Sequence, residues 1–301
     1  MVAAHGRHYD IELAGGERVR GFPRGKKSIY ACGDEVEVQR ISANQVQILT
    51  NLPRRSLLYR SDAYREKLIA ANATQAVLVV ATEPSFSVEL LSRILVAAES
   101  QELRSLIVLN KIDLADRVPA ARAQLAPLAA LSYPLVEISA RQDATPLLPH
   151  LAGQVSVIVG QSGMGKSSLV NALVPSAQAA TREISTVLDS GKHSTTHARL
   201  YRLSEDAALI DCPGLQEFGL AHLPAGAIEQ GFIELRPYLG KCRFRDCHHQ
   251  AEPDCAIKEA VALGKVDAQR LLHFQRLTAG RPKLKFQPFG SHGGAQVGRR
   301  Y

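Results

Sequence analysis

A glycine-rich segment in the middle of the chain has the residue types and the spacing of a phosphate-binding loop. It runs from Gly160 to Ser167 as Gly-Gln-Ser-Gly-Met-Gly-Lys-Ser and follows the apolar run 155–159. In the pattern G-x-x-x-x-G-K-[ST], backbone N–H groups point at phosphates, the catalytic lysine reaches the β- and γ-phosphates, and the final hydroxyl binds Mg²⁺. An ordinary glycine-rich turn is the alternative. The residues assigned to phosphate or Mg²⁺ are Gly160, Gln161, Ser162, Gly163, Met164, Gly165, Lys166, Ser167 and Ser168.

Two further loops have residues suited to a guanine base. The sequence Asn-Lys-Ile-Asp at 110–113 follows the apolar run 105–109, and Ser-Ala at 139–140 follows the run 134–138. The Asp113 carboxylate can accept the N1–H and N2–H of guanine, and adenine offers neither donor. A backbone N–H in the second loop suits the guanine O6. For each loop taken alone, a solvated turn is the alternative. The residues assigned to the base are Asn110, Lys111, Asp113, Ser139 and Ala140.

A fourth motif, Asp-Cys-Pro-Gly at 211–214, follows the apolar run 207–210. The Asp211 carboxylate would lie near Mg²⁺, acting through water, and the Gly214 N–H would meet a γ-phosphate. A helix N-cap or turn role is the alternative for Asp211. Because all four motifs follow predicted strands, together they predict a GTPase.

The order of these motifs differs from that of ordinary small GTPases, which begin with the phosphate-binding loop. Here the motifs start at residues 110, 139, 160 and 211. Because the ends of a domain often lie close together, a chain can be cut in one loop and rejoined at its old ends around the same sheet. The sequence therefore predicts a circularly permuted GTPase domain. The segment that begins at Asp211 then leads into the C-terminal region, so we expect nucleotide state to be reported there.

Cysteine spacing predicts a metal site after the fourth motif. Three thiolates and one imidazole in the pattern Cys-x4-Cys-x-His-x5-Cys make a closed set, typical of one structural zinc ion. Redox-active thiols are the alternative, and His248 could replace the assigned histidine. We expect Cys32 and Cys212 to be free thiols. The assigned zinc ligands are Cys242, Cys247, His249 and Cys255.

The elements that must position these motifs follow two patterns. From residue 72 onward, strand patterns alternate with helical ones, which is typical of a mostly parallel α/β sheet. Short strand patterns before residue 70 predict a small basic β-barrel, either an oligonucleotide-binding (OB-fold) barrel or another type. We expect strands at 17–22, 28–31, 35–41, 46–50, 76–81, 105–109, 134–138, 155–159 and 207–210, and helices over 88–100 and up to residue 131.

The expected parts are a barrel at 1–70, a permuted GTPase domain at 71–222, a zinc-binding helical domain at 223–280 and a flexible basic tail at 281–301. One amphipathic helix is expected over 256–277 in the third part. The tail contains no acidic residue. It is suited to order on an RNA backbone, and a plain solubilising tail is the alternative.

Composition sets broader limits. The 301 residues are 46% hydrophobic and 22% charged, which is ordinary for a globular protein. No apolar run approaches the roughly 20 residues that span a bilayer, and no signal-peptide pattern begins the chain. We therefore expect a cytoplasmic protein without membrane contact. Lys and Arg outnumber Asp and Glu by 36 to 29, which favours a polyanionic partner. No long heptad pattern indicates a coiled-coil dimer, and we expect a monomer.

In this order, the four motifs and the cysteine pattern closely resemble the bacterial circularly permuted GTPases of the RsgA/YjeQ family. The resemblance covers nearly the whole chain. It implies an N-terminal oligonucleotide-binding barrel, a central GTPase domain and a C-terminal zinc domain. It also implies a cytoplasmic factor that binds the small ribosomal subunit and its rRNA and hydrolyses GTP to GDP slowly alone and faster on the subunit. This factor would assist late maturation and promote the release of other assembly factors.

The residue after the fourth motif limits the mechanism. Ras-like enzymes place a water-orienting glutamine there, whereas this chain has Leu215, so we expect slow intrinsic turnover. The family resemblance implies that Thr195 binds Mg²⁺ and the γ-phosphate. It makes His193 the candidate for positioning water once RNA orders this loop. A histidine that contacts RNA phosphate or solvent is the alternative for His193.

Two other functions stay in consideration. One is an RNA-binding assembly chaperone in which GTP mainly orders the fold and hydrolysis is incidental. The other is a metabolic kinase, which would prefer adenine and need a base for its acceptor. The Asp113 carboxylate argues against the kinase.

Overall fold

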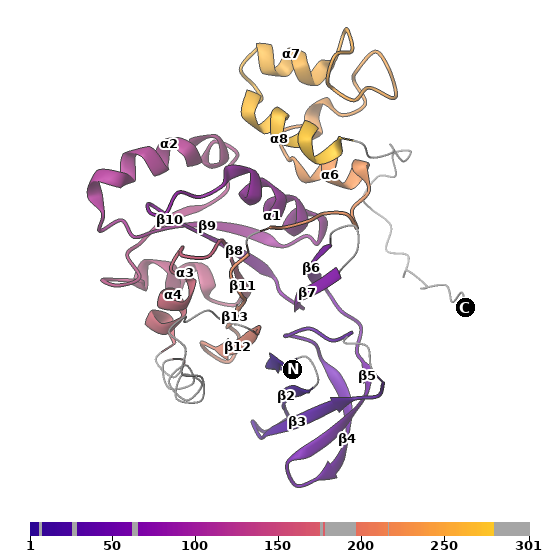
Figure 1. The fold of residues 1–301 in the computed structure, drawn as a ribbon, viewed down its shortest axis with the longest axis vertical. Helices are drawn as coiled ribbons and strands as arrows, with labels where there is room; N and C mark the ends of the chain where they lie inside the picture. Colours follow the sequence, from indigo (N-terminus) through magenta and orange to yellow (C-terminus); the bar gives the residue numbers. More distant parts are fainter. Residues whose placement is uncertain are drawn as a thin grey trace.

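The computed structural model describes residues 1–5, 8–25, 29–61, 66–174, 177, 197–215 and 217–279. The molecule is elongated, with the first strands of the chain at one end and its last helices at the other (Figure 1). A large sheet with flanking helices lies between these ends.

The central part is a mostly parallel sheet. Its strands are β8 (Gln75–Ala81), β9 (Arg104–Asn110), β10 (Leu135–Glu137), β11 (Val155–Val159), β12 (Arg199–Arg202) and β13 (Ala208–Asp211). They follow the order β10-β9-β8-β11-β13-β12, and every neighbouring pair is parallel except β12 with β13. The mostly parallel sheet predicted after residue 72 is thus confirmed.

Helices cover both faces of this sheet. They are α1 (Val88–Ser100), η1 (Ala115–Arg117), α2 (Val118–Ala129), η2 (Thr145–Leu147), α3 (Leu148–Leu151) and α4 (Lys166–Leu173). The helices α1 and α2 lie on one side of the sheet, and α3 and α4 lie on the other (Figure 1). Every residue of β8 is consequently buried, as expected for a strand covered on both faces.

Local sequence explains where α1 and α4 begin. The Ser87 hydroxyl accepts a hydrogen bond from the Leu90 N–H at 3.1 Å, which caps the first turn of α1. Gly165 precedes α4 with a φ of 86°, a backbone conformation that glycine adopts without strain. Both helices therefore start at the edge of the sheet where the predicted motifs lie.

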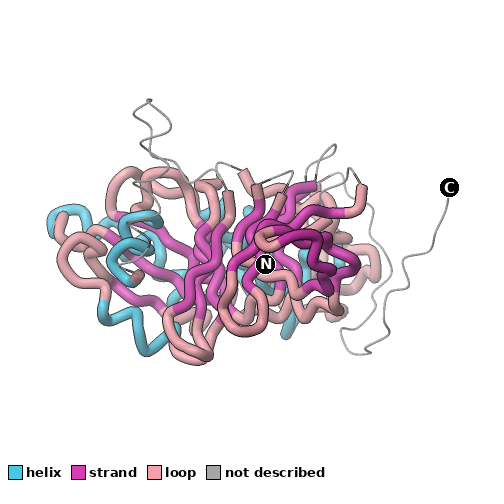
Figure 2. Tube along the Cα trace, turned by 90° about the horizontal axis from the view of Figure 1, so that it is seen from below, coloured by secondary structure: helices cyan, strands magenta, loops and turns pink. Residues whose placement is uncertain are grey.

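The N-terminal part adds five strands. They are β1 (Ala3–Ala4), β2 (Tyr9–Glu12), β3 (Arg18–Pro23), β4 (Val36–Ser42) and β5 (Gln45–Asn51). Their order is β1-β2-β3-β5-β4, with β3 and β5 parallel and the other pairs antiparallel. Because β1 also pairs with β12, the two sheets are continuous, and Figure 2 shows their strands side by side across the molecule.

These strands test part of the predicted barrel. The strands expected at 17–22, 35–41 and 46–50 correspond to β3, β4 and β5. The strand expected at 28–31 is wrong, because residues 29–31 form no strand. The Asp34 carboxylate accepts a hydrogen bond from the Ala31 N–H at 2.7 Å, which holds a turn there. In the described part of the chain no pairing joins β4 to β1, so an OB-fold barrel and the domain limits stay predictions.

A separate antiparallel hairpin, β6 (Leu57–Ser61) with β7 (Glu66–Ala71), connects the N-terminal strands to the central sheet. It also contacts the segment that follows β13. The Ser61 N–H donates to the Gly219 carbonyl at 3.0 Å, and the Ala221 N–H donates to the Ser61 carbonyl at 3.1 Å. The His222 ring lies against Tyr59, with centroids 3.9 Å apart. The hairpin is therefore attached to the chain just after the fourth motif.

The C-terminal part is helical. Its elements are α6 (Ala225–Gly231), η3 (Arg236–Tyr238), α7 (Ala256–Ala262) and α8 (Ala268–Thr278). A buried guanidinium joins this part to α1: Arg270 donates to Glu234 at 2.6 Å and to the Ser92 hydroxyl at 2.7 Å. The same guanidinium lies 4.5 Å from the centre of the Phe232 ring. These contacts fix the C-terminal part against the central one.

The single helix expected over 256–277 is wrong, because the chain forms α7 and α8 instead. Gly264, with a φ of 67°, ends the first helical segment, and the Asp267 carboxylate caps the second by accepting from the Arg270 N–H at 3.0 Å. None of the helices in the described ranges is long and apolar enough to cross a membrane.

Candidate nucleotide and metal sites

The glycine-rich loop lies between β11 and α4. Gly160 has a φ of 155°, and a Cβ there would lie 2.3 Å from the Val79 carbonyl oxygen, so only glycine fits. The buried Lys166 ammonium donates to the carbonyl oxygens of Gly160 and Gln161 at 2.9 and 2.8 Å. Burial lowers the pKa of Lys166, and the nearby charge of Asp211 opposes that shift. The geometry is that of a phosphate-binding loop with its lysine folded over the turn.

Asn110, at the end of β9, connects three of the predicted loops. Its side-chain amide donates to the Met164 carbonyl at 3.0 Å, in the glycine-rich loop. Its side-chain oxygen accepts from the N–H groups of Lys111 at 2.8 Å and Ala140 at 2.9 Å. Asn110 is only 2% exposed. The structure therefore brings together the predicted base-binding and phosphate-binding loops through this buried side chain.

The other base-loop residues are placed at the same edge. The Lys111 ammonium donates to the carbonyl oxygens of Glu83 and Gly163 at 2.6 and 2.8 Å. The exposed Asp113 carboxylate accepts from the Ser139 hydroxyl at 2.6 Å, which fixes the direction of the carboxyl group. A carboxylate held at the rim in this way can accept a further donor from a ligand.

The fourth motif lies directly against the glycine-rich loop. Asp211 ends β13 and is 5% exposed. A Cβ on Gly214 would lie 3.1 Å from the Ser162 Cα and 3.3 Å from the Lys166 Nζ, so the two loops approach closely. The Leu215 N–H donates to the Gly160 carbonyl at 3.0 Å, and the Leu215 side chain is buried.

Sequence reasoning missed the loop that follows β8. The Thr82 hydroxyl donates to the Lys111 carbonyl at 2.9 Å, and the Gln161 side chain accepts from the Ser87 N–H at 2.7 Å. The available signal was position: this loop leaves the carboxyl end of a parallel strand, where ligands bind in such sheets. The predicted residues His193 and Thr195 lie outside the described residues.

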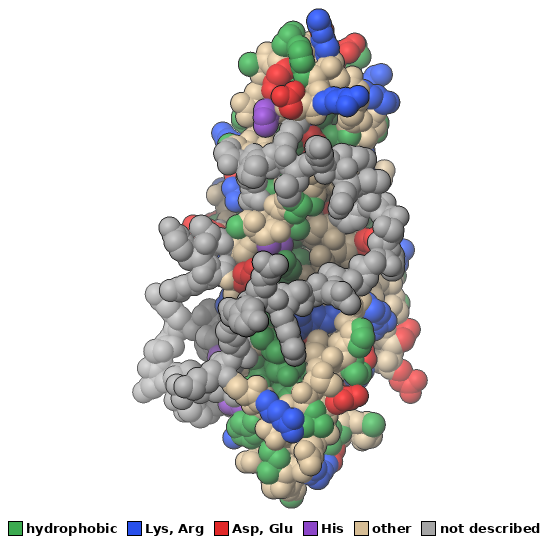
Figure 3. Space-filling view, turned by 90° about the vertical axis from the view of Figure 1, so that its right-hand side faces the viewer, with side chains coloured by type: hydrophobic (Ala, Val, Ile, Leu, Met, Phe, Trp, Pro, Cys, Tyr) green, Lys and Arg blue, Asp and Glu red, His purple; other side chains and the backbone are tan. Residues whose placement is uncertain are grey.

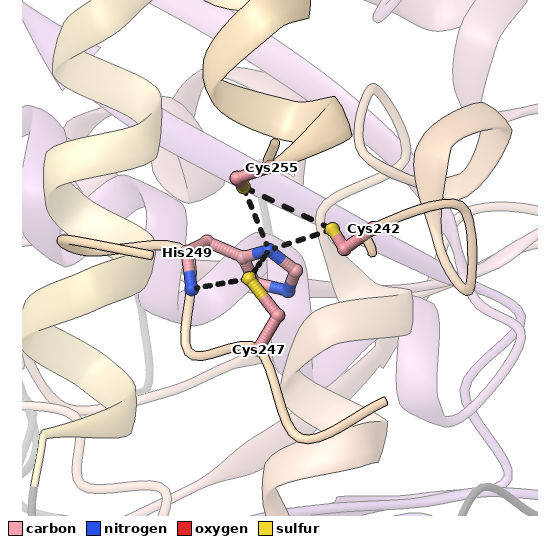
Figure 4. A group of neighbouring side chains, drawn as sticks. All are labelled: Cys242, Cys247, His249 and Cys255. Carbon is pink, nitrogen blue, oxygen red and sulfur yellow. Dashed lines mark hydrogen bonds between the residues drawn. The ribbon is translucent and has the colours of Figure 1, made fainter. Parts of the chain in front are cut away.

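The predicted metal ligands form one cluster in the C-terminal part (Figure 4). The His249 Nδ1 lies 3.4, 3.5 and 3.3 Å from the sulfurs of Cys242, Cys247 and Cys255, and the Cys242 and Cys255 sulfurs are 3.8 Å apart. A tetrahedral zinc site has S–S edges of about 3.8 Å and S–N edges of about 3.6 Å. These distances are close to those edges, so the four side chains are compatible with a zinc site.

The surroundings of this cluster support an ordered metal site. The His249 Nε2 lies 2.8 Å from the Glu229 carboxylate of α6, so the ring has a partner on its far side, as in many metal centres. His248 is exposed and outside the cluster. All five cysteines are free thiols, as predicted for Cys32 and Cys212. Both of these are buried, and burial raises the pKa of Cys32 to about 12.

A mostly parallel sheet with a phosphate-binding loop, and with the base-binding loops earlier in the chain, defines a circularly permuted GTP-binding protein. Comparisons with known proteins give the same class of protein.

The RsgA GTPase family profile matches residues 51–221. The "Small ribosomal subunit biogenesis GTPase RsgA" of Nitrosomonas europaea is 52% identical over 286 residues, covering 94% of this chain and 91% of that protein. The Burkholderia pseudomallei protein of that name is 54% identical over 275 residues, covering 90% and 88%.

Solved structures give the same result. The crystal structure of YjeQ from Thermotoga maritima matches with a TM-score of 0.70 at 29% identity, covering 93% of this chain and 98% of that one. YloQ, described as a circularly permuted GTPase, matches with a TM-score of 0.67 at 24% identity, which supports the fold; it covers 94% and 96%. The chain belongs to the RsgA GTPase family. It is therefore a GTP-hydrolysing enzyme, and its family implies Mg²⁺ with GTP.

Proposed function

We propose that this GTPase binds the small ribosomal subunit and assists its late maturation. It would hydrolyse GTP slowly alone and faster on the subunit, and it would promote the release of other assembly factors. The names of its relatives support a role in small-subunit biogenesis. We also propose that the protein acts in the cytoplasm and as a monomer. The observation that carries the proposal is that the four nucleotide-binding motifs lie at one edge of the sheet, with a buried leucine, Leu215, directly after the fourth motif in place of a catalytic glutamine.

In the proposed site, Asp113 pairs with guanine, and a backbone N–H of the 139–140 loop meets its O6. The hydrogen bond from Ser139 leaves Asp113 able to accept from the base, which supports this assignment. Lys166, Ser167 and the loop N–H groups would bind the phosphates and Mg²⁺. Asp211 would act through water, and Gly214 would meet the γ-phosphate.

Slow intrinsic turnover follows from Leu215. A buried hydrocarbon side chain can neither orient nor deprotonate a water molecule, so an additional group has to position the nucleophile. We assign this role to His193, with Thr195 on Mg²⁺, when RNA orders their segment. A subunit-dependent rate is the consequence.

The path of the chain supports a link between the nucleotide and the C-terminal part. After Gly214 the chain contacts the β6–β7 hairpin and then enters α6, whose Glu229 meets the ring of His249. A γ-phosphate that moves Gly214 would therefore act on a segment already bound to the N-terminal hairpin and to the metal cluster. We propose that one zinc ion holds this cluster in a structural role.

Charge supports an RNA partner. Exposed Arg and Lys side chains occur on both outer parts of the molecule, and Figure 3 shows basic side chains near both of its ends. Such side chains neutralise RNA phosphates and make binding salt-dependent. The N-terminal strand order, with β3 parallel to β5, is compatible with an OB-fold RNA-binding unit. These exposed residues are Arg18, Arg20, Arg24, Arg40, Lys241, Arg243 and Arg245.

The test is GTP turnover by the purified protein with and without small ribosomal subunits at near-physiological salt. Large subunits and ATP are the controls. A rise in turnover number of about tenfold or more, equal to about 1.4 kcal/mol of barrier, supports the proposal if it is specific to small subunits and GTP. Nucleotide-dependent binding without any rise would favour the RNA-binding chaperone, which the buried Leu215 also suits.

A further inference from the structure

Three histidines come together where the N-terminal strands join the central sheet. Ala3 of β1 pairs with Arg199 of β12, so the next opposed positions place His5 across from His197. Ala4 of β1 pairs with Tyr9 of β2, which places His5 across from His8 as well. The His5 N–H donates to the His8 carbonyl at 3.0 Å. The strand register therefore brings the imidazoles of His5 and His8 into one row with that of His197, which is distant in sequence.

These side chains share one face of the sheet. Directly opposed residues in antiparallel strands point to the same side, and Asp10 points with His8 because it is two residues further along β2. The His5 ring centre lies 4.8 Å from that of His8 and 5.4 Å from that of His197. The His5 Nε2 lies 3.0 Å from an Asp10 carboxylate oxygen. Imidazole and carboxylate are the ligands that Zn²⁺ and similar ions bind.

We propose that His5, His8, Asp10 and His197 form a second metal site, which binds a divalent transition-metal ion of the Zn²⁺ type. In this site the ligand atoms have to move closer together when the metal ion binds. The ligand atoms of His5, His8 and Asp10 lie within 4.8 Å of one another, against edges of about 3.4 Å in a tetrahedral site with nitrogen and oxygen ligands. His197 is outside this group, and its exposed ring, centred 5.4 Å from that of His5, has to move closer to become the fourth ligand. The His5 and Asp10 side chains are 26% and 33% exposed, so they are free to rotate by the amount required.

The charges around the cluster set its chemistry. Burial and the neighbouring His5 lower the pKa of His8, with Arg20 adding to the shift, and burial and His5 also lower the pKa of His197. Asp10 adds a negative charge, whereas Arg20 opposes a cation. We accordingly expect weaker binding than at the cysteine cluster.

A bound ion would tie His5 and His8, which flank the β1–β2 connection, to His197, two residues before β12. The backbone already links these segments, because the Leu200 N–H donates to the Val2 carbonyl at 2.7 Å. The ion would add a side-chain link between the N-terminal unit and the GTPase sheet. This inference does not rest on the proposed ribosomal function.

The test is calorimetric titration of the untagged full-length protein with ZnCl₂, in excess Mg²⁺ and without nucleotide. The protein is first loaded with one zinc per chain, checked by elemental analysis, so that the cysteine cluster is filled. We expect a second equivalent to bind. Loss of one ligand in His197→Ala or His5→Gln should weaken it by roughly tenfold or more, since loss of an outer partner alone typically has that effect.

His150→Ala is the matched control, because His150 is exposed and distant in the fold from this cluster. It should bind the second equivalent as the unchanged protein does. The proposal is overturned if the unchanged protein takes up no second equivalent, or if His197→Ala and His5→Gln bind it with unchanged affinity. Equal loss in His150→Ala would show adventitious surface binding and would overturn it too. GTP turnover of each variant, measured alongside, reports separately on the nucleotide site.

Discussion

Replacing Asn110 by alanine tests whether one buried amide holds the nucleotide loops together. The side chain makes three hydrogen bonds, at 2.8, 2.9 and 3.0 Å, to Lys111, Ala140 and Met164. Each neutral bond contributes about 0.5–1.5 kcal/mol net, so their sum is about 1.5–4.5 kcal/mol. In the unchanged protein the Asn110 amide holds the three nucleotide loops together. In Asn110→Ala this ordering has to come from the bound nucleotide, which lowers the free energy gained on binding. We therefore expect GDP affinity to fall by about 10- to 100-fold, or about 1.4–2.7 kcal/mol.

The assay is equilibrium binding of a fluorescent GDP analogue at fixed Mg²⁺, with urea unfolding measured in parallel. Asn72→Ala is the matched control. Asn72 is also buried and makes two similar bonds, accepting from the Arg55 N–H at 2.9 Å and donating to the Gly33 carbonyl at 3.0 Å. It should lower the free energy of unfolding and leave GDP affinity unchanged. If Asn110→Ala binds GDP within about threefold of the unchanged protein, the reasoning is wrong.

Three further changes test other contacts. Asp113→Asn should lower GDP affinity by roughly 100-fold and favour xanthine nucleotides, because its amide would face the N2–H of guanine. The control is Asp116→Asn, at an exposed position nearby, which should do neither. Equal effects of the two changes would refute the assignment of Asp113 to the base. Glu229→Ala should weaken zinc binding by about 10- to 100-fold in chelator competition, and unchanged affinity would remove its orienting role. Arg270→Met should lower the free energy of unfolding in urea by about 3–5 kcal/mol, because it leaves the buried Glu234 carboxylate without its ion-pair partner. Adding Glu234→Leu should restore most of that free energy. A double variant as unstable as Arg270→Met would contradict this reasoning.

Sequence patterns were most informative where a strand ran directly into a motif. The apolar run at 155–159 became β11 with the same limits, and the glycine-rich loop follows it as predicted. The helix expected over 88–100 is α1, because Ser87 caps it and its apolar positions keep a helical period. In both cases the local sequence and the tertiary environment favour the same structure, so local patterns were sufficient.

Other features depend on contacts between distant residues. The two-residue strand β1 exists because β2 and β12 lie on either side of it, and Ala3–Ala4 has no strand pattern of its own. Sequence assigned Asn110 to the base, whereas its described contacts join three loops. Glu229 precedes His249 by 20 residues, and no spacing rule relates a metal ligand to such a partner. Tertiary packing alone places these groups together.

On the proposed function, the circular permutation explains why the segment 211–229 can serve both outer parts of the molecule. Between the fourth motif and residue 279, the residues that the structure describes do not return to the sheet. The chain passes from the fourth motif at Gly214 to the hairpin at Ser61, then through α6 to the metal cluster. On this proposal, a change at the γ-phosphate would be carried by one covalent segment to the N-terminal hairpin and to the helices that hold the cluster. Because Leu215 in the same segment cannot activate water, binding of the outer parts to RNA can set both the position of this segment and the rate of hydrolysis.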